Sequence, residues 1–131
     1  MKKLACTILL LSLVTLAACS NAVLGGPSEI TFSNSYENFD HQNTKRVFST
    51  NEDIAMNMDF GGKVNTTSVG ILVLQGKDEE IYDSFDMDTD PSWPAMIAEL
   101  YWSGELDPGL YTVKAILHDQ DIVSVGKFKV E

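Results

Sequence analysis

One stretch decides the fold class: Leu106-Asp107-Pro108-Gly109-Leu110-Tyr111-Thr112-Val113-Lys114-Ala115-Ile116-Leu117. The pair Pro108-Gly109 is typical of a tight turn, since proline presets one backbone angle and glycine accepts conformations that other residues avoid. After the turn, apolar side chains alternate with Thr112 and Lys114, which is the two-residue period of a strand with one buried face. The sequence therefore predicts a turn that leads into a half-buried strand from 110 to 117.

Further strands are predicted downstream of this stretch. His118-Asp119-Gln120-Asp121 is typical of a turn, and Ile122 to Val130 forms the last predicted strand. Its inward face is expected to switch from Val123 and Val125 to Phe128 and Val130. Gly126 lies where a β-bulge would allow that switch.

Upstream, β-rich runs predict strands at 30–33, 46–49, 54–60, 69–74 and 81–87. In 54–60, Ile54, Met56, Met58 and Phe60 share one face, and 81–87 alternates apolar and acidic residues from Ile81. The run 69–74 is almost continuously apolar and too short for a typical helix, so we expect a central strand buried on both faces. Residues 92–102 fit either a helix or a strand, and we favour a strand over 96–102 because its neighbours are all β.

The turn at 106–111 resembles the Leu-x-Pro-Gly-x-Tyr corner that precedes a late strand in immunoglobulin-like and fibronectin-like sandwiches. Short strands at regular spacing, with no βαβ alternation, also favour a sandwich or a barrel. The resemblance implies an all-β, immunoglobulin-like β-sandwich of about seven to eight strands. It also implies a structural corner in which the Tyr111 hydroxyl bonds back to the turn, Leu106 fills the core end of the preceding strand, and Pro108 and Gly109 make the bend. The chain lacks a Cys-Trp-Cys core, which excludes an antibody-type domain.

The first residues have the three parts of a secretory signal. Lys2 and Lys3 are followed by an apolar run over 4–16 and by the small pair Ala17-Ala18. The apolar run is shorter than the roughly 20 residues that a permanent membrane-spanning helix needs. We therefore expect a cleaved signal peptide.

Leu16-Ala17-Ala18-Cys19 resembles the lipobox of bacterial lipoproteins. The resemblance implies that the Cys19 sulfur receives a diacylglyceryl group and that cleavage occurs just before it. Cys6 lies in the signal, so Cys19 is the only cysteine of the expected mature chain, and a thioether to lipid would cap it. Two or three acyl chains would hold the protein to a membrane permanently. The alternative is an ordinary secreted protein with an incidental Cys19.

Three segments follow from these features: a lipoprotein signal peptide at 1–18, a lipidated tether at 19–28 and a β-sandwich domain at 29–131. In Gram-negative members of the class, aspartate after the cysteine retains the protein at the inner membrane. Ser20 occupies that position here, so the resemblance implies the periplasmic side of the outer membrane. In a Gram-positive cell it implies the exterior of the cell membrane.

The chain has a formal charge of −10, with 19 acidic and 9 basic residues, which argues against a nucleic-acid partner. Seven of the carboxylates fall within the thirteen residues 78–90. Asp86, Asp88 and Asp90 have the spacing that starts a calcium loop, but Pro91 and Ile97 stand where such a loop needs glycine and glutamate. We therefore predict no strong metal site there, and instead a charged edge strand or a docking face for a basic partner.

Aromatic residues flank this acidic segment, and together they predict a candidate binding face, with packing of the aromatic rings in the core as the alternative. The residues of this face are Tyr82, Asp83, Asp86, Asp88, Asp90, Trp93 and Trp102. We find no Gly-x-Ser-x-Gly elbow and no partners for His41 or His118, so we predict no catalytic residue, metal or cofactor.

These features favour a membrane-anchored, non-enzymatic protein-binding or adaptor module that acts on an envelope protein, preferably a basic one. The alternative is an inhibitor of a basic enzyme such as a protease or lysozyme, whose surface would attract a protein with a pI near 4.4.

Overall fold

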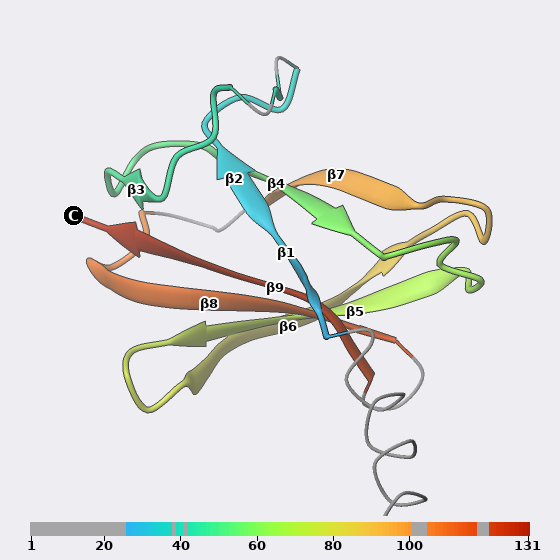
Figure 1. The fold of residues 1–131 in the computed structure, drawn as a ribbon. Helices are drawn as coiled ribbons and strands as arrows, with labels where there is room; N and C mark the ends of the chain where they lie inside the picture. The colour runs from blue at the N-terminus through green and yellow to red at the C-terminus, as the bar shows by residue number, and fades with distance from the viewer. Residues whose placement is uncertain (1–25, 38, 41, 101–104, 118–120) are drawn as a thin grey trace, which may run out of the picture.

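The structure, a computed structural model, describes residues 26–37, 39–40, 42–100, 105–117 and 121–131 (Figure 1). The predictions for the signal peptide, for Cys19, for Trp102 and for most of the turn at 118–121 lie outside these residues. No helix occurs in the described part of the chain, and hence none that could cross a membrane.

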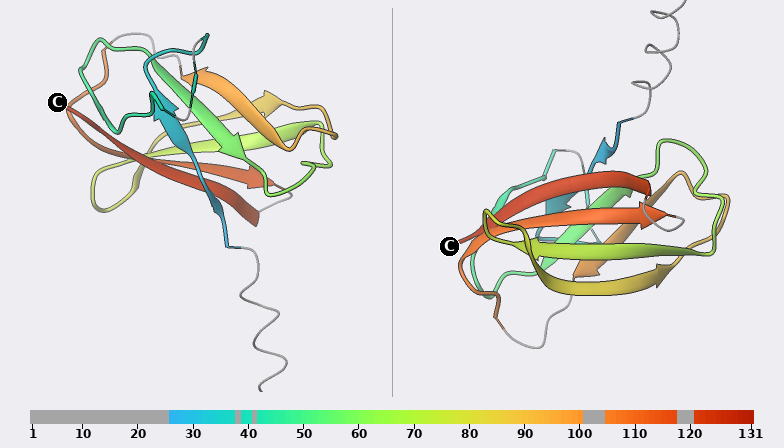
Figure 2. Two further views of the ribbon diagram at one scale, coloured as in Figure 1. Left: turned by 45° about the horizontal axis from the view of Figure 1, so that its top comes forward. Right: turned by 90° about the horizontal axis from the view of Figure 1, so that it is seen from below.

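The described residues form nine strands in two sheets that pack face to face (Figures 1 and 2). The strands are β1 (Ser28–Glu29), β2 (Thr31–Ser33), β3 (Val47–Phe48), β4 (Ile54–Asp59), β5 (Ser68–Gln75), β6 (Glu80–Asp88), β7 (Ala95–Leu100), β8 (Gly109–Leu117) and β9 (Asp121–Val130). One sheet has the order β1-β9-β8-β5-β6, with β3 also paired to β9, and the other has the order β2-β4-β7. The prediction of an all-β sandwich is confirmed. The strand that we favoured over 96–102 is confirmed as far as Leu100, and its last two residues lie outside the described ranges.

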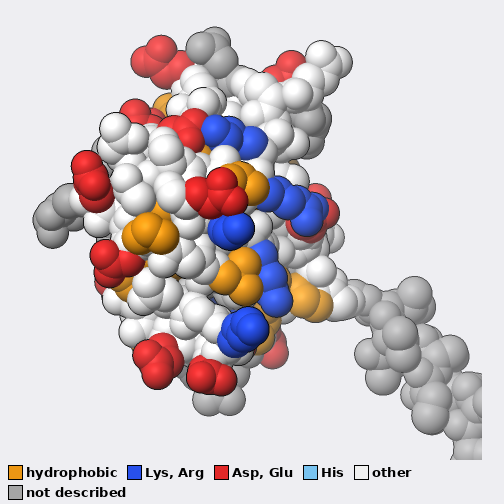
Figure 3. Space-filling view, turned by 90° about the vertical axis from the view of Figure 1, so that its left-hand side faces the viewer, with side chains coloured by type: hydrophobic (Ala, Val, Ile, Leu, Met, Phe, Trp, Pro, Cys, Tyr) orange, Lys and Arg blue, Asp and Glu red, His pale blue; other side chains and the backbone are white. Residues whose placement is uncertain are grey.

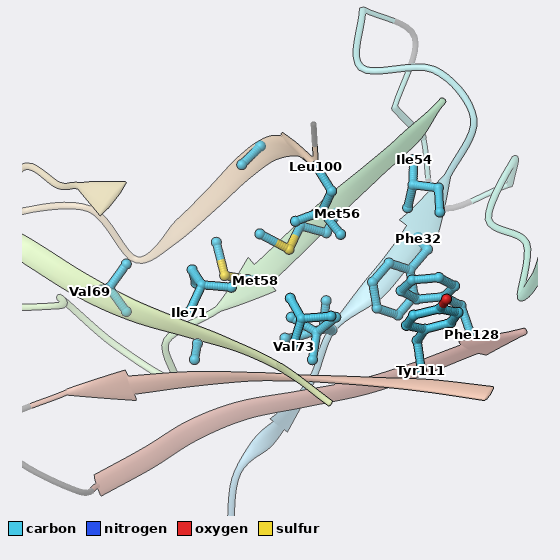
Figure 4. Close-up of a cluster of buried hydrophobic side chains, with 14 of the residues drawn as sticks. Phe32, Ile54, Met56, Met58, Val69, Ile71, Val73, Leu100, Tyr111 and Phe128 are labelled. Atoms are coloured by element: carbon cyan, nitrogen blue, oxygen red, sulfur yellow. The ribbon is translucent and has the colours of Figure 1, made fainter. Parts of the chain in front are cut away.

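The core lies between the two sheets, where their inward side chains meet (Figure 4). Phe32 from the smaller sheet packs edge-on against Phe128 from the larger one, with 5.1 Å between ring centroids. The Tyr111 ring stacks on Phe128, also with 5.1 Å between centroids and nearly parallel. These rings bury large apolar areas in favourable geometries and tie the two layers together.

The Tyr111 side chain closes the turn that precedes β8. Its hydroxyl donates to the Asp107 carbonyl oxygen at 2.7 Å and accepts from the Gln75 side-chain amide at 3.1 Å. The ring is fully buried, and Leu106 is buried in the core beside it. Burial, with smaller effects from Tyr82 and Asp107, raises the pKa of Tyr111. The hydroxyl therefore makes the hydrogen bond to the turn that the corner sequence implies.

The first described strands pass from one sheet to the other. Ser28 pairs with Ser124 of β9, so the last residue of the expected tether already belongs to the larger sheet. Ile30 then crosses between the layers and donates its N–H to the Val125 carbonyl at 2.9 Å before β2 joins β4. Gly126 lies directly under this crossing, where an added Cβ would sit 2.5 Å from the Ile30 carbonyl oxygen.

The predicted face switch at Gly126 is wrong. Register between β8 and β9 changes at Val123, because Ala115 pairs with Ser124 while Ile116 pairs with Ile122. From Ser124 to Val130 every second residue is buried without interruption, and Gly126 is among them. The glycine is needed for the close approach of Ile30 and makes no bulge.

Two further expectations need correction. In β5, Val69, Ile71 and Val73 of the inner face are buried. On the outer face Leu74 is buried but Leu72 is only half-buried, so the strand is central and its outer face is only partly covered. In β6 the register shifts so that Val73 pairs with Asp83 and Leu74 with Ile81, which leaves Tyr82 as an extra residue. The bulge turns Tyr82 inward and leaves Ile81 outward, 71% exposed, which breaks the predicted alternation.

Glu52 stabilises the loop between β3 and β4 through hydrogen bonds to its carboxylate. Its carboxylate accepts from the Lys45 ammonium, from the Asn34 amide at 2.9 Å and from the Ser49 N–H at 3.0 Å. These hydrogen bonds, of which the one from Lys45 has the largest effect, lower the pKa of Glu52 from 4.5 to about 2. Because the charged form is favoured in the folded state, the stabilisation is present above pH 4.5 and is lost as the pH falls toward 2.

Glu52→Gln is therefore expected to reduce the free energy of unfolding at pH 7 by about 1 to 2 kcal/mol, as for a hydrogen bond to a charged group. The difference between the variant and the wild type should disappear as the pH falls from about 4.5 to about 2. Urea denaturation at several pH values measures it. A gap that stays constant across this range would contradict the assignment.

Candidate functional site

Strands β6 and β7 are the edges of their sheets on the same side of the sandwich, and a groove runs between them. Among the described residues, β6 pairs only with β5 and β7 only with β4. The groove, which we call the edge groove, has a volume of about 550 Å³. It is lined by Asp83, Phe85, Asp86, Met87, Asp88, Met96 and Glu99.

The edge groove has an apolar floor and an acidic rim. Phe85, Met87 and Met96 form the floor, where they are partly buried and pack against the core. Alternation along β6 separates these side chains from Asp86 and Asp88, which are exposed. The groove can thus bury apolar groups and attract positive charge at the same time.

The rim carboxylates of β6 have no ion-pair partner within the described part of the chain. The ion pairs within this part of the chain lie away from the edge groove and are Lys45–Glu52, Arg46–Glu29, Lys114–Glu79 and Lys129–Glu131. Asp83 accepts the Ser84 N–H at 2.8 Å, and no ion pair neutralises it. In the same residues, no three His, Cys, Asp or Glu side chains lie together in a way that could hold a metal ion.

A second hollow, about 560 Å³ in volume, lies on the other side of β7. We call it the outer hollow, and its lining residues are Tyr36, Asn57, Trp93, Ala95, Met96 and Ile97. Trp93 is 41% exposed and Ile97 is 40% exposed, so the hollow presents large apolar groups to solvent. Met96 lines both cavities, and β7 therefore forms the ridge between them.

The predicted binding face is divided in the structure. Its members Asp83, Asp86 and Asp88 line the edge groove, whereas Trp93 lies in the outer hollow. Two other members, Tyr82 and Asp90, make structural contacts instead. The Tyr82 ring packs edge-on against Tyr111 at 5.4 Å, which is the core packing that we considered as the alternative.

Asp90 shapes the turn that precedes β7. Its carboxylate accepts from the Ser92 N–H at 2.9 Å and from the Ser92 hydroxyl at 2.6 Å, and these bonds lower the pKa of Asp90. Its carbonyl also accepts the Trp93 N–H at 3.0 Å. Asp90 thus helps to present Trp93 rather than to line the edge groove.

Sequence analysis missed Tyr36, Met96 and Ile97. Ile97 lies in the apolar run Ala95 to Ala98, and an edge strand usually carries charge at such an outward position, but only the sheet order shows that β7 is an edge. Tyr36 gave no such signal, because its part in the hollow depends on the loop after β2 reaching the face of β7.

Basic side chains gather elsewhere on the molecule. Figure 3 shows Lys and Arg side chains in a band, with acidic side chains around it. Lys127 and Lys129 alternate with buried residues of β9, and Lys114 lies on the outer face of the adjacent strand β8. Of these, Lys114 pairs with Glu79 at 3.5 Å and Lys129 with Glu131 at 2.9 Å, so much of their charge is compensated.

The sequence matches no protein-family model and no curated protein. The chemistry of the edge groove and of the outer hollow is therefore the basis for assigning a function.

Proposed function

We propose that this chain is a lipid-anchored, non-enzymatic binding module that takes up a segment of a basic envelope protein in the edge groove. One observation carries the proposal: an open groove joins the apolar floor of Phe85, Met87 and Met96 to the rim carboxylates of Asp86 and Asp88, which form no ion pair within the described part of the chain. Apolar burial would supply affinity, while the rim would select positive charge and speed the encounter.

The anchor in this proposal is the lipid on Cys19, which rests on the lipobox sequence. The first described residue, Gly26, lies seven positions after Cys19. A stretch of that length spans at most about 25 Å when fully extended. The module would then work close to the bilayer, on the periplasmic side of the outer membrane or, in a Gram-positive cell, outside the cell membrane.

Site-specific photocrosslinking in cells of the source organism tests the proposal. A photoreactive residue at position 87 lies in the floor of the edge groove, and one at position 122 on β9 is the control, because Ile122 is exposed and far from the groove in the sheet order. We expect a discrete adduct with a basic protein from position 87 and none from 122. Asp86→Lys with Asp88→Lys should abolish the adduct, and Cys19→Ala should move the protein out of the membrane fraction.

Equal adducts from both positions, or none from position 87, would contradict a binding role for the edge groove. An adduct with a protease or lysozyme whose activity the protein blocks would favour the inhibitor over the adaptor. A Cys19→Ala variant that is still processed and membrane-bound would remove the lipid anchor from the proposal.

A further inference from the structure

We infer that the partner segment binds as an additional β-strand on the free edge of β7, with its side chains entering the edge groove and the outer hollow alternately. This inference rests on the proposed function and specifies its mode of recognition. Such strand addition uses main-chain hydrogen bonds for affinity and alternate side-chain pockets for specificity.

The hydrogen-bond pattern between β4 and β7 shows which backbone groups are available. The Phe60 N–H donates to the Pro94 carbonyl at 2.9 Å, so these two residues form a hydrogen-bonded pair. Such pairs alternate along an antiparallel ladder, which places Met96 opposite Met58 in the next one. The N–H and C=O groups of Ala95 and Ile97 therefore point away from β4, toward the free edge.

The side-chain environment matches what an added strand requires. Successive side chains of a strand point to opposite faces of its sheet, and a strand beside β7 would follow the same rule. One set would face the edge groove, above Phe85 and Met87, and the other would face the outer hollow, beside Trp93 and Ile97. Two cavities of about 550 and 560 Å³ thus flank one edge.

The two edge strands beside the edge groove, β6 and β7, differ in their protection against strand pairing. β6 carries a bulge at Tyr82 and a row of carboxylates, both of which discourage a neighbouring strand. β7, with the sequence Ala-Met-Ile-Ala-Glu-Leu, has no proline, no lysine and a single charge. An edge of this kind is ordinarily a liability, and its position between two cavities that both expose apolar side chains points to use as a binding edge.

Charge complementarity favours a cationic segment over a second copy of this chain. Pairing of β7 with β7 would bring two acidic rims together in chains that each have a formal charge of −10. A segment that alternates apolar residues with Lys or Arg would turn its cations into the edge groove, where they lie near Asp86 and Asp88 with their aliphatic stems over the floor. Its apolar groups would then enter the outer hollow, beside Trp93 and Ile97. The expected occupant is therefore an extended, basic and amphipathic stretch of a partner protein.

The test uses the full-length protein in detergent and a defined probe, a ten-residue peptide of alternating lysine and valine, with binding measured by calorimetry. A peptide of the same sequence with N-methyl groups on alternate residues is the control probe, because it keeps the charge but loses the donors along one edge. We expect the first peptide to bind and the methylated one to bind at least about tenfold more weakly, as for the loss of one or two hydrogen bonds.

Ile97→Pro and Ile97→Ala are the matched variants. Proline removes an N–H that faces the free edge, a position where strands tolerate it, whereas alanine keeps the donor and removes the side chain. We expect Ile97→Pro to weaken binding about tenfold or more and Ile97→Ala by less than about threefold. Thermal denaturation of both variants checks that they fold.

Strand addition and the proposed function fail on different results. Unchanged binding to Ile97→Pro, equal binding of both peptides, or no binding to the wild-type protein would overturn strand addition. If Asp86→Asn with Asp88→Asn weakens peptide binding while Ile97→Pro does not, the groove binds its partner without an added strand. Dimerisation that Ile97→Pro abolishes would show that a second copy occupies the edge, and would also overturn the inference. The crosslinking at position 87 judges the proposed function independently of these results.

Discussion

Gly126→Ala is expected to reduce the free energy of unfolding by about 3 kcal/mol, the upper part of the usual range for overpacking a core. An alanine Cβ at this position would lie 2.5 Å from the Ile30 carbonyl oxygen and 2.7 Å from both the Ile30 Cβ and the Phe32 ring. The nearest of these atoms is a backbone oxygen, and the Ile30 Cβ moves only with its backbone, so neither can turn away as the end of a flexible side chain could. Strand β1 is paired to β9 just before the crossing and β2 to β4 just after it, so relief of the contact would disturb both sheets.

Thermal and urea denaturation measure this effect, and the melting temperature should fall by about 10 °C or more. Gly70→Ala is the matched control, because its Cβ would meet Asp86 Oδ1 at 3.5 Å and the Ile116 carbonyl oxygen at 3.6 Å, which are ordinary contacts. That variant should change stability by no more than about 1 kcal/mol. Similar losses from the two variants would show that strand propensity, and not the crossing of Ile30, decides the cost at Gly126.

Local alternation was enough to predict most strands. Ile54, Met56 and Met58 all turned out to be buried, and the strand after the Pro-Gly turn begins at Gly109. Such patterns survive folding because a two-residue period presents one apolar face wherever the strand lies in the sheet. Strand β1 was not predicted and brings the total among the described residues to nine, above the predicted seven or eight, whereas β3 lies within the strand predicted at 46–49.

The errors share a physical cause, which is contact between residues distant in sequence. Gly126 is required by the Ile30 backbone, and no pattern near Gly126 reveals that neighbour. Ile81 faces solvent because β6 shifts register against β5, and a bulge leaves little trace in the sequence of one strand. The incomplete burial of Leu72 likewise depends on the fold, because the sequence of β5 does not show whether another layer covers its outer face.

The acidic half of the candidate site was predictable, and its apolar half was not. Carboxylates at 83, 86 and 88 are visible in the sequence and line the edge groove as part of the predicted face. The floor, however, needs Phe85 and Met87 of one sheet to lie beside Met96 of the other. Which two strands form the edges on one side is a property of the topology, so the groove could not be derived before the sheet order was known.

Tyr111→Phe is expected to reduce the free energy of unfolding by about 1 to 3 kcal/mol, since it leaves buried hydrogen-bonding groups without their partner. The Asp107 carbonyl loses its 2.7 Å donor and the Gln75 amide its 3.1 Å acceptor, while the ring can keep its stacking on Phe128. Thermal denaturation should show a melting temperature several degrees lower. Tyr36→Phe is the control, because Tyr36 is 47% exposed. Loss of its hydroxyl should change the free energy of unfolding by less than about 0.5 kcal/mol.

Two further readouts separate the corner from a recognition role for Tyr111. Because its pKa is raised above 10, folding favours the protonated hydroxyl, and this stabilisation is present below pH 10 and lost as the pH rises through the folded-state value. The gap between the wild type and Tyr111→Phe should therefore narrow above pH 10. Binding of the lysine-valine peptide at low temperature should stay unchanged, since Tyr111 is fully buried and lies outside the lining of the edge groove. Weaker binding with an unchanged melting temperature would be incompatible with a structural corner, and would remove the one local sequence that resembles immunoglobulin-like sandwiches.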